Sequence, residues 1–421
     1  MKVKISLKQG WFSKLLALYV IIWAVLPIVQ YGLVNRLLVA AAALIWFAIA
    51  IGSSIVRGGG VSLKIFAAVI TFTLLTIFIG VICNEGLFET FISRLQSIIF
   101  LLILCIGVYY FEKEPDFLIT AMKIVVPIVF VVAFLTFREA QLTPGISRLM
   151  VWDEEVARQY ASKGVGGYGL IYSAVFYASC LLYLFAANAV RRKFWVALVI
   201  IMFALTVLTS GFLIASIMMI TSLFVFFFGL YTKKDRLRVI GSILIIGVAA
   251  YFLIQIVFIN NGDKLVELFD GTLYETKMRE IVLMFQEEQN VGHLQGRTSR
   301  YLESIYAVLK YPFLGAKISG DIEGVGGHSM LLDIWGTYGL MFSFGYYYAM
   351  YKAFRIMTKN KAEIGLVSVF MVLLLANGCF NTFAYEHAVA FFIIFPATIL
   401  LRIKKREEEN ENYMDNPLGN A

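Results

Sequence analysis

Two arginines lie three residues apart in a stretch whose apolar residues recur at helical spacing. Arg297 and Arg300 belong to GRTSRYLESIYAVLKYPFLG, residues 296–315, which predicts an amphipathic helix at the membrane surface. At positions i and i+3 the two guanidinium groups point the same way, and each can donate bidentate hydrogen bonds to phosphate oxygens. The pair would therefore suit a diphosphate. Spacing alone favours the simpler alternative, which is a solvated charged face with Glu303 neutralising Arg300.

A histidine follows at the start of an apolar run, in GVGGHSMLLDIWGTYGL, residues 324–340. Ser329 is a natural N-cap, so His328 lies at a helix N-terminus, where the macrodipole disfavours the imidazolium form. A neutral imidazole there is competent to take the proton of a sugar hydroxyl. Asp333 lies further inside the run, where a carboxylate is costly and indicates a functional site. A capping role for His328 and a structural role for Asp333 are the alternatives.

The elements that carry these residues belong to an integral membrane protein. Of 421 residues, 60% are hydrophobic and only 15% are charged, whereas soluble domains have roughly 25% charged residues. The apolar residues form blocks of about twenty, the length of a membrane-spanning helix. We therefore predict a single all-α polytopic domain over residues 1–403 with about twelve transmembrane helices. The expected spans are 15–30, 36–56, 63–82, 95–111, 117–136, 167–188, 194–209, 212–230, 239–259, 329–351, 363–380 and 386–402.

The placement of Lys and Arg predicts which side of the membrane each connection faces. With a cytoplasmic N-terminus, most of the 36 basic residues fall in cytoplasmic connections, and the short outer connections hold only Arg36 and Arg94. This is the pattern of the positive-inside rule. The long outer loops are then 137–166 and 260–328, the second of which precedes the tenth span and is expected to be partly helical. Both termini are cytoplasmic, and the charged tail 404–421 is expected to be disordered.

Further candidates for substrate binding lie in the smaller outer loop and at the outer end of the fourth span. They are Arg94, Gln96, Arg138, Arg148, Trp152 and Arg158. Arg138 ends the fifth span and is the arginine of its loop best placed to face a diphosphate at membrane level; an interfacial anchor is the alternative. Trp152 could stack on a sugar ring.

Composition also speaks against several other classes. The four cysteines show no CxxC spacing and no accompanying His cluster, so we expect free thiols, no metal ion and no cofactor. The net charge of +8 would suit nucleic acid in a soluble protein, but in a membrane protein the placement of Lys and Arg matters more, and no nucleic-acid partner is expected. The basic N-terminus has no small-x-small cleavage site, which indicates a retained first span.

Three consecutive features of the sequence together resemble the Wzy polysaccharide polymerases. They are an Arg-bearing surface helix that ends in YPFLG, a Gly-rich connection, and the motif G-H-S-x-x-x-D-x-x-x-x-Y-G-L at the start of a span. These enzymes belong with the WaaL-type O-antigen ligases. About twelve spans, with the large outer loop before the tenth, are also typical of that family. Family members often carry a Ser-Arg-Gly turn between two middle spans. Here the turn is LTSGF, residues 208–212, and the arginine is missing.

The resemblance implies a glycosyltransferase in the bacterial cytoplasmic membrane that makes O-antigen, capsule or exopolysaccharide. It would move a growing glycan from undecaprenyl diphosphate to a hydroxyl of a lipid-linked repeat unit on the outer face, without a nucleotide sugar. The family's roles carry over to Arg297 and Arg300 for the diphosphate and to His328 for catalysis. Expected partners are the lipid-linked oligosaccharide, the bilayer, a chain-length regulator and a flippase.

Two other functions stay open. An O-antigen ligase would use the same donor with a lipid A-core acceptor, but ligases tend to have Asn after the His, so Ser329 and Asp333 favour the polymerase. A transporter or flippase would need ionisable residues or broken helices near the midplane of several spans. The centres of these spans are almost free of charge, and the link around 191–193 is short for a transporter built from paired halves.

Overall fold

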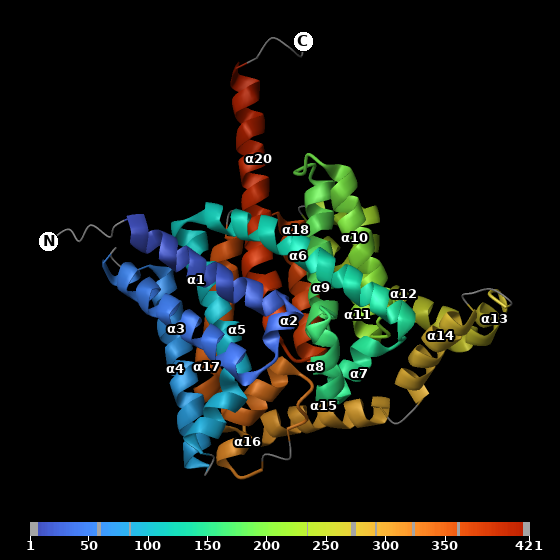
Figure 1. Ribbon diagram of the computed structural model, residues 1–421, viewed down its shortest axis with the longest axis horizontal. Helices are drawn as coiled ribbons and strands as arrows, with labels where there is room; N and C mark the ends of the chain where they lie inside the picture. Colours follow the sequence, from blue (N-terminus) through green and yellow to red (C-terminus); the bar gives the residue numbers. More distant parts are fainter. Residues whose placement is uncertain are drawn as a thin grey trace.

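The computed structural model describes residues 7–56, 60–83, 86–233, 235–270, 275–290, 293–321, 325–359 and 363–415. The regular elements in these ranges are all helices, and no strand occurs among them (Figure 1). Within these ranges, seven helices are long and apolar enough to cross a membrane. The prediction of an all-α polytopic membrane protein is confirmed to that extent.

The expected spans coincide with helices. The bounds are α1 Leu7–Val25, α2 Pro27–Gln30, α3 Leu33–Val56, α4 Val61–Ile82, α5 Leu87–Lys113, α6 Pro115–Leu142, α9 Tyr168–Ala186, α10 Lys193–Leu208, α11 Leu213–Phe227, α12 Arg236–Ile254, α17 Met330–Thr358, α18 Ile364–Phe380, α19 Tyr385–Val389 and α20 Phe395–Asp415. A π-helical turn, Ala390–Ile394, joins α19 to α20. Besides the seven long apolar helices, the described residues contain four shorter apolar helices and the 29-residue α17, and these coincide with the remaining expected spans. The number of about twelve spans stays a prediction.

Two ends of the chain differ from the expectation. The first span, expected over 15–30, begins earlier and breaks at Leu26, which is extended because Pro27 follows it and starts α2. The tail was expected to be disordered, yet α20 continues to Asp415. Its charges pair along the helix and with neighbouring segments: Lys405 with Glu408 at 4.0 Å, Arg191 with Glu408 at 3.8 Å, and Arg406 with Glu363.

Three helical segments form the centre of the bundle. The apolar windows of α5 and α9 are each 83% buried, and that of the α19–α20 run is 78% buried, against 39% for α3 and α4 and 17% for α12. Without a hydrophobic drive between helices in lipid, close packing must hold such a centre together. Gly107 of α5 supplies it, since a Cβ there would overlap the carbonyl oxygen of Phe392.

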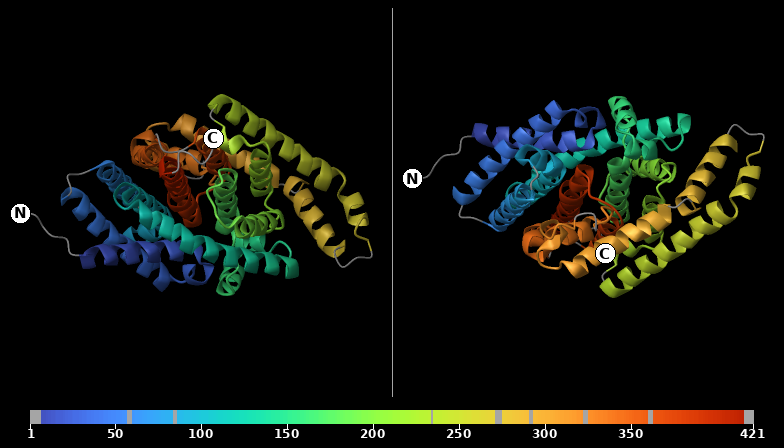
Figure 2. Two further views of the ribbon diagram at one scale, coloured as in Figure 1. Left: turned by 90° about the horizontal axis from the view of Figure 1, so that it is seen from above. Right: turned by 90° about the horizontal axis from the view of Figure 1, so that it is seen from below.

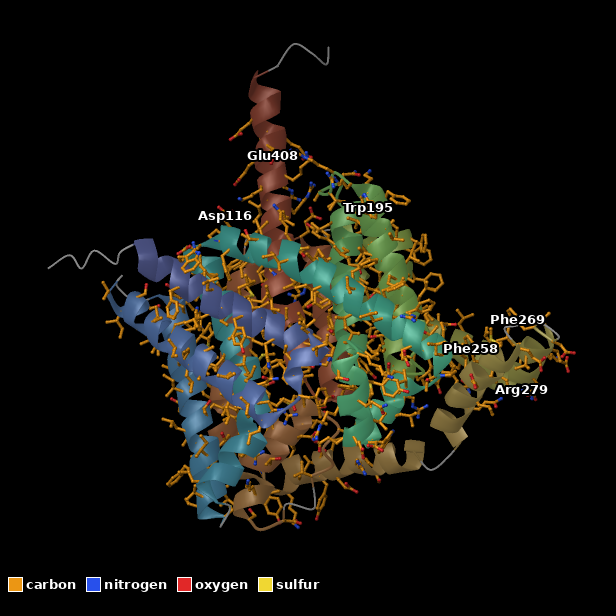
Figure 3. The ribbon with its side chains drawn as sticks, in the orientation of Figure 1. Asp116, Trp195, Phe258, Phe269, Arg279 and Glu408 are labelled. Atoms are coloured by element: carbon orange, nitrogen blue, oxygen red, sulfur yellow. The ribbon has the colours of Figure 1, made fainter. Side chains whose placement is uncertain are left out.

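The described parts of the two long connections contain several helices. The first contains α7 Ile146–Trp152 and α8 Glu154–Ser162, and the second contains α13 Gly262–Glu267, α14 Glu275–Asn290, α15 His293–Lys310 and α16 Gly315–Ile318. α15 runs across one end of the bundle, and α20 projects from the other end, where Asp116 and Glu408 also lie (Figures 1 and 3). α15 therefore lies at the end away from the α20 tail.

α13 and α14 form an arm beside the bundle, next to the end of α12 (Figure 2). Phe258 lies at the base of the arm, and Phe269 and Arg279 lie further out (Figure 3). The rings of Phe258 and Phe285 are 4.9 Å apart, which joins α14 to the last turn after α12. The arm thus leads the chain from α12 to the start of α15.

The YPFLG segment after α15 packs on a break in α17. Gly339 has a left-handed φ of 67°, which interrupts the helix. The amides of Leu340 and Met341, released by this break, donate to the carbonyl oxygens of Pro312 and Phe313 at 2.9 and 3.2 Å. A Cβ on Gly339 would overlap the Phe313 carbonyl. The break in α17 therefore fixes the C-terminal end of α15 against α17.

Candidate active site

A cavity of 480 Å³ opens where α15, α7, α9, α19 and α2 meet. Its lining includes two arginines, a histidine, a tryptophan, a tyrosine and a carboxylate, which are Arg148, Arg300, His328, Trp152, Tyr385 and Glu386. The size is within the range of small-molecule sites. The lining comes from both long connections and from the ends of apolar helices.

Arg300 and His328 form the closest polar contact described in this cavity. The Arg300 Nη1 atom and the His328 Nε2 atom are 2.7 Å apart. A guanidinium can only donate hydrogen bonds, so Nε2 is the acceptor and the ring proton is on Nδ1. The imidazole in this contact is therefore neutral. Its Nε2 lone pair, however, is occupied by Arg300.

Asp333 and Ser329 hold the segment that carries His328. The Ser329 amide donates to Asp333 Oδ2 at 2.7 Å, and the Ser329 hydroxyl caps α17 by accepting from the Leu332 amide at 3.4 Å. Asp333 Oδ1 accepts from the Ser304 hydroxyl of α15 at 2.6 Å. Asp333 thus joins α15 to the start of α17, which is the structural alternative for this residue. It lines a hollow of 160 Å³ that is separate from this cavity.

The connection before α17 touches the backbone of α15. The Gly326 amide donates to the Ser304 hydroxyl at 3.1 Å. A Cβ on Gly326 would overlap the carbonyl oxygen of Arg300. Only glycine allows this approach, and it brings His328 beside the Arg300 side chain.

The α18–α19 connection is fixed by side chains from three other helices. Tyr301 of α15, Tyr168 of α9 and Gln96 of α5 each donate to one of its carbonyl oxygens. The acceptors are Phe380 at 2.9 Å, Thr382 at 3.1 Å and Phe383 at 3.1 Å respectively. The start of α19, and with it Glu386, therefore has a defined position relative to α15.

Glu386 forms an acidic cluster with Gln30 and Tyr31, which we call the glutamate cluster. The Gln30 Nε2 atom donates to Glu386 Oε1 at 3.4 Å and to the Ala24 carbonyl oxygen at 2.9 Å. Glu386 Oε2 is buried and has no hydrogen-bond partner among the described residues. Gly169 makes room for it, since a Cβ there would overlap Oε2. Burial raises the pKa of Tyr31, and the nearby Glu386 carboxylate raises it further.

The cavity brings together part of the predicted site. Arg300, His328, Arg148, Trp152 and Gln96 all line it. Arg297 lies on α15, but its side chain is outside the described residues.

The other predicted binding residues lie elsewhere. Arg158 pairs with Glu154 on the surface of α8 at 3.2 Å, and the exposed Arg138 is not among the lining residues. Arg94 lines a separate hollow of 160 Å³ between α4, α5 and α17, with its guanidinium carbon 5.4 Å from the centre of the Tyr338 ring. Within the smaller outer loop, Arg148 rather than Arg138 reaches the cavity.

Sequence reasoning missed Glu386 and the tyrosines of α9. Tyr168 and Tyr172 line the cavity from α9 and Glu386 from α19. One signal for Glu386 was present, because a carboxylate at the end of an apolar span is costly, the criterion that selected Asp333. No comparable signal exists for the tyrosines, which are common at the ends of membrane helices.

The arrangement combines cationic, aromatic and acidic groups in one cavity. Arg148 and Arg300 can hold an anion, Trp152 offers a ring face, and Glu386 is a proton acceptor when ionised. Such a set suits transfer of a group that leaves as an anion. No protein-family model matches the chain, and no curated protein matches it.

Proposed function

We propose that this chain is a polysaccharide polymerase of the Wzy type in the bacterial cytoplasmic membrane. It transfers a growing glycan from undecaprenyl diphosphate to a hydroxyl of a lipid-linked repeat unit on the outer face. The observation that carries the proposal is the cavity in which Arg300 and His328, 28 residues apart in sequence, meet at 2.7 Å beside Arg148.

The diphosphate of the donor binds to Arg300 and Arg148. Each guanidinium offers a planar pair of donors that matches two phosphate oxygens, which Lys cannot reproduce. Positive charge aimed at the leaving group stabilises the transition state more than the ground state, since negative charge develops there. His328, which accepts from Arg300 Nη1, fixes the direction in which that guanidinium points.

The sugars next to the diphosphate bind along the aromatic part of the cavity. Trp152, Tyr168, Tyr172 and Tyr301 line it together with Asn381. Tyrosine and tryptophan combine an apolar face with a polar group, so they suit a carbohydrate that has both kinds of surface. The cavity volume of 480 Å³ accommodates only the reacting end of a long glycan. The rest of the chain extends outside.

Deletion of the gene in its host tests this function. Wild-type protein supplied in trans should restore long chains, and His328→Ala should leave single repeat units on the lipid because Arg300 loses its partner. Gel analysis of the lipid-linked and surface glycans is the measurement. Arg158→Ala is the matched control, since Arg158 pairs with Glu154 on the surface of α8.

The same strains separate the rival functions. Long chains that stay on undecaprenyl diphosphate after deletion would indicate a ligase, and repeat units retained on the inner leaflet would indicate a flippase. Unchanged long chains in the His328→Ala strain would contradict the proposed polymerase site.

A further inference from the structure

We infer that Glu386, rather than His328, accepts the proton of the attacking sugar hydroxyl. This inference rests on the proposed function and names the group that completes its chemistry. It starts from the contrast between a histidine whose nitrogen is occupied and a carboxylate oxygen that is not.

His328 has no available lone pair while its contact with Arg300 lasts. Nε2 accepts from Arg300 Nη1 at 2.7 Å, which leaves the ring proton on Nδ1. A general base needs a lone pair within hydrogen-bond reach of the hydroxyl. Protonation of His328 would also place a second positive charge next to Arg300, and repulsion between the two cations at this distance disfavours it. The pair is therefore built to orient a guanidinium.

Glu386 has the properties that His328 lacks. Its Oε2 atom is buried without a hydrogen-bond partner among the described residues, although the side chain lines the cavity. Its Oε1 atom is held by Gln30 at 3.4 Å, which restricts rotation of the carboxylate. The Glu386 carboxylate packs on the backbone of Gly169, where a Cβ would overlap Oε2, and this contact fixes the position of that atom. A buried polar atom left unbonded is costly, and a bound hydroxyl would satisfy it.

Glu386 also stands at a fixed place in the fold. It lies in the first turn of α19, where the helix N-terminus favours a negative charge. The connection just before it is held by Tyr301, Tyr168 and Gln96, so its position is coupled to α15, which carries Arg300. Precise placement of this kind is what a proton acceptor requires.

The reaction balances with these groups alone. The acceptor hydroxyl oxygen forms a bond to the anomeric carbon of the donor glycan, and the bond from that carbon to the diphosphate oxygen breaks. The electron pair of the broken bond leaves with the diphosphate, which Arg300 and Arg148 stabilise. The hydroxyl proton moves to Glu386 Oε2 and is later released to water. The products are the lengthened glycan on the acceptor lipid and free undecaprenyl diphosphate.

The test uses the full chain in lipid nanodiscs with two probes. Geranylgeranyl diphosphate reports on the arginines, and repeat units isolated from the deletion strain report on transfer. Glu386→Gln should bind geranylgeranyl diphosphate like wild type, but its transfer rate should fall by about 10²- to 10⁴-fold, the usual contribution of general-base catalysis. Glu386→Ala should regain part of its rate with added formate, which a merely structural residue would not allow. Glu155→Gln, at an exposed position on α8, is the matched control.

The outcomes distinguish this inference from the proposed function. Wild-type protein that neither binds geranylgeranyl diphosphate nor extends the isolated units would overturn both. An active wild type with a fully active Glu386→Gln variant would overturn only the role of Glu386. Loss of diphosphate binding in Glu386→Gln, or no response of Glu386→Ala to formate, would also overturn it, because Glu386 would then belong to the scaffold.

Discussion

Around Arg300 and His328 each supporting polar group is bonded to a neighbour, whereas in the glutamate cluster Glu386 Oε2 has no partner among the described residues. The first region gains rigidity from Ser304, Asp333 and the close approach of Gly326. The second keeps one reactive atom at the cost of an unsatisfied group. In the proposed reaction, where one substrate is held and the other is activated, the difference separates binding from proton transfer.

We expect the largest effect on the region around Arg300 and His328 from Gly326→Ala. The new Cβ would overlap the Arg300 carbonyl oxygen, so the connection must move away from α15. We expect transfer to fall by about 10²-fold, since a shift of about 1 Å is enough for such a loss, and the unfolding free energy to fall by about 1–3 kcal/mol. Gly241→Ala is the control, because nothing lies within 4 Å of its Cβ position. Wild-type transfer by the Gly326→Ala variant would show that the close approach of Gly326 to Arg300 is not required for activity.

Asp333→Ala should have the next largest effect. It leaves the Ser329 amide without its acceptor and removes the link from Asp333 to Ser304 of α15, so we expect a loss of about 2 kcal/mol in stability and a parallel loss of transfer. Asp333→Asn is a matched control with a smaller expected loss. Its amide oxygen still accepts from Ser329, and the Ser304 hydroxyl can turn to the Arg300 carbonyl at 3.0 Å. Thermal unfolding in detergent is the measurement, and equal melting temperatures for the two variants would contradict the network.

Gln30→Ala gives the smallest expected change in transfer rate, and it tests the glutamate cluster instead of the region around Arg300. Glu386 Oε1 loses its contact with Gln30, so the carboxylate gains freedom to rotate. This hydrogen bond to the carboxylate is long at 3.4 Å, so its loss is worth about 1 kcal/mol, which predicts a transfer rate reduced by about fivefold. Binding of geranylgeranyl diphosphate should stay unchanged. Weaker binding of this probe would show that the glutamate cluster also serves the donor.

The sequence was a good guide to local features. Hydropathy located the apolar helices, and helical spacing predicted a helix over 296–315, whereas α15 spans His293–Lys310 and the YPFLG segment after it is not part of the helix. The N-cap at Ser329 followed from residue type and is present, with its hydroxyl accepting from Leu332. Which face of α15 packs inward was less evident. Ser304 and Ala307 are buried against α17, while Leu302 and Leu309 are 60% and 74% exposed. Small residues face α17 because they allow close backbone approach, as between Ala307 and Gly336.

The membership of the cavity was harder to foresee. Arg138 and Arg148 lie in one loop and are alike in type, but only Arg148, which is on α7, lines the cavity. The tail was expected to be disordered from composition, but α20 continues to Asp415, and its charged residues form ion pairs with Glu363 and Arg191 in other segments. Composition and spacing describe neighbours along the chain, so they carry no information on such partners.

By itself, the sequence determined that the chain is a helical membrane protein, that Arg300 lies on an amphipathic helix, and that His328 lies at a helix start. Each of these follows from hydropathy, from a 3.6-residue period or from capping, which act over one or two helical turns. Only the tertiary structure decided that Arg300 occupies the Nε2 atom of His328 and that Glu386 shares their cavity. Glu386 meets Gln30 across 356 residues of sequence, and only packing of the whole bundle brings such residues together.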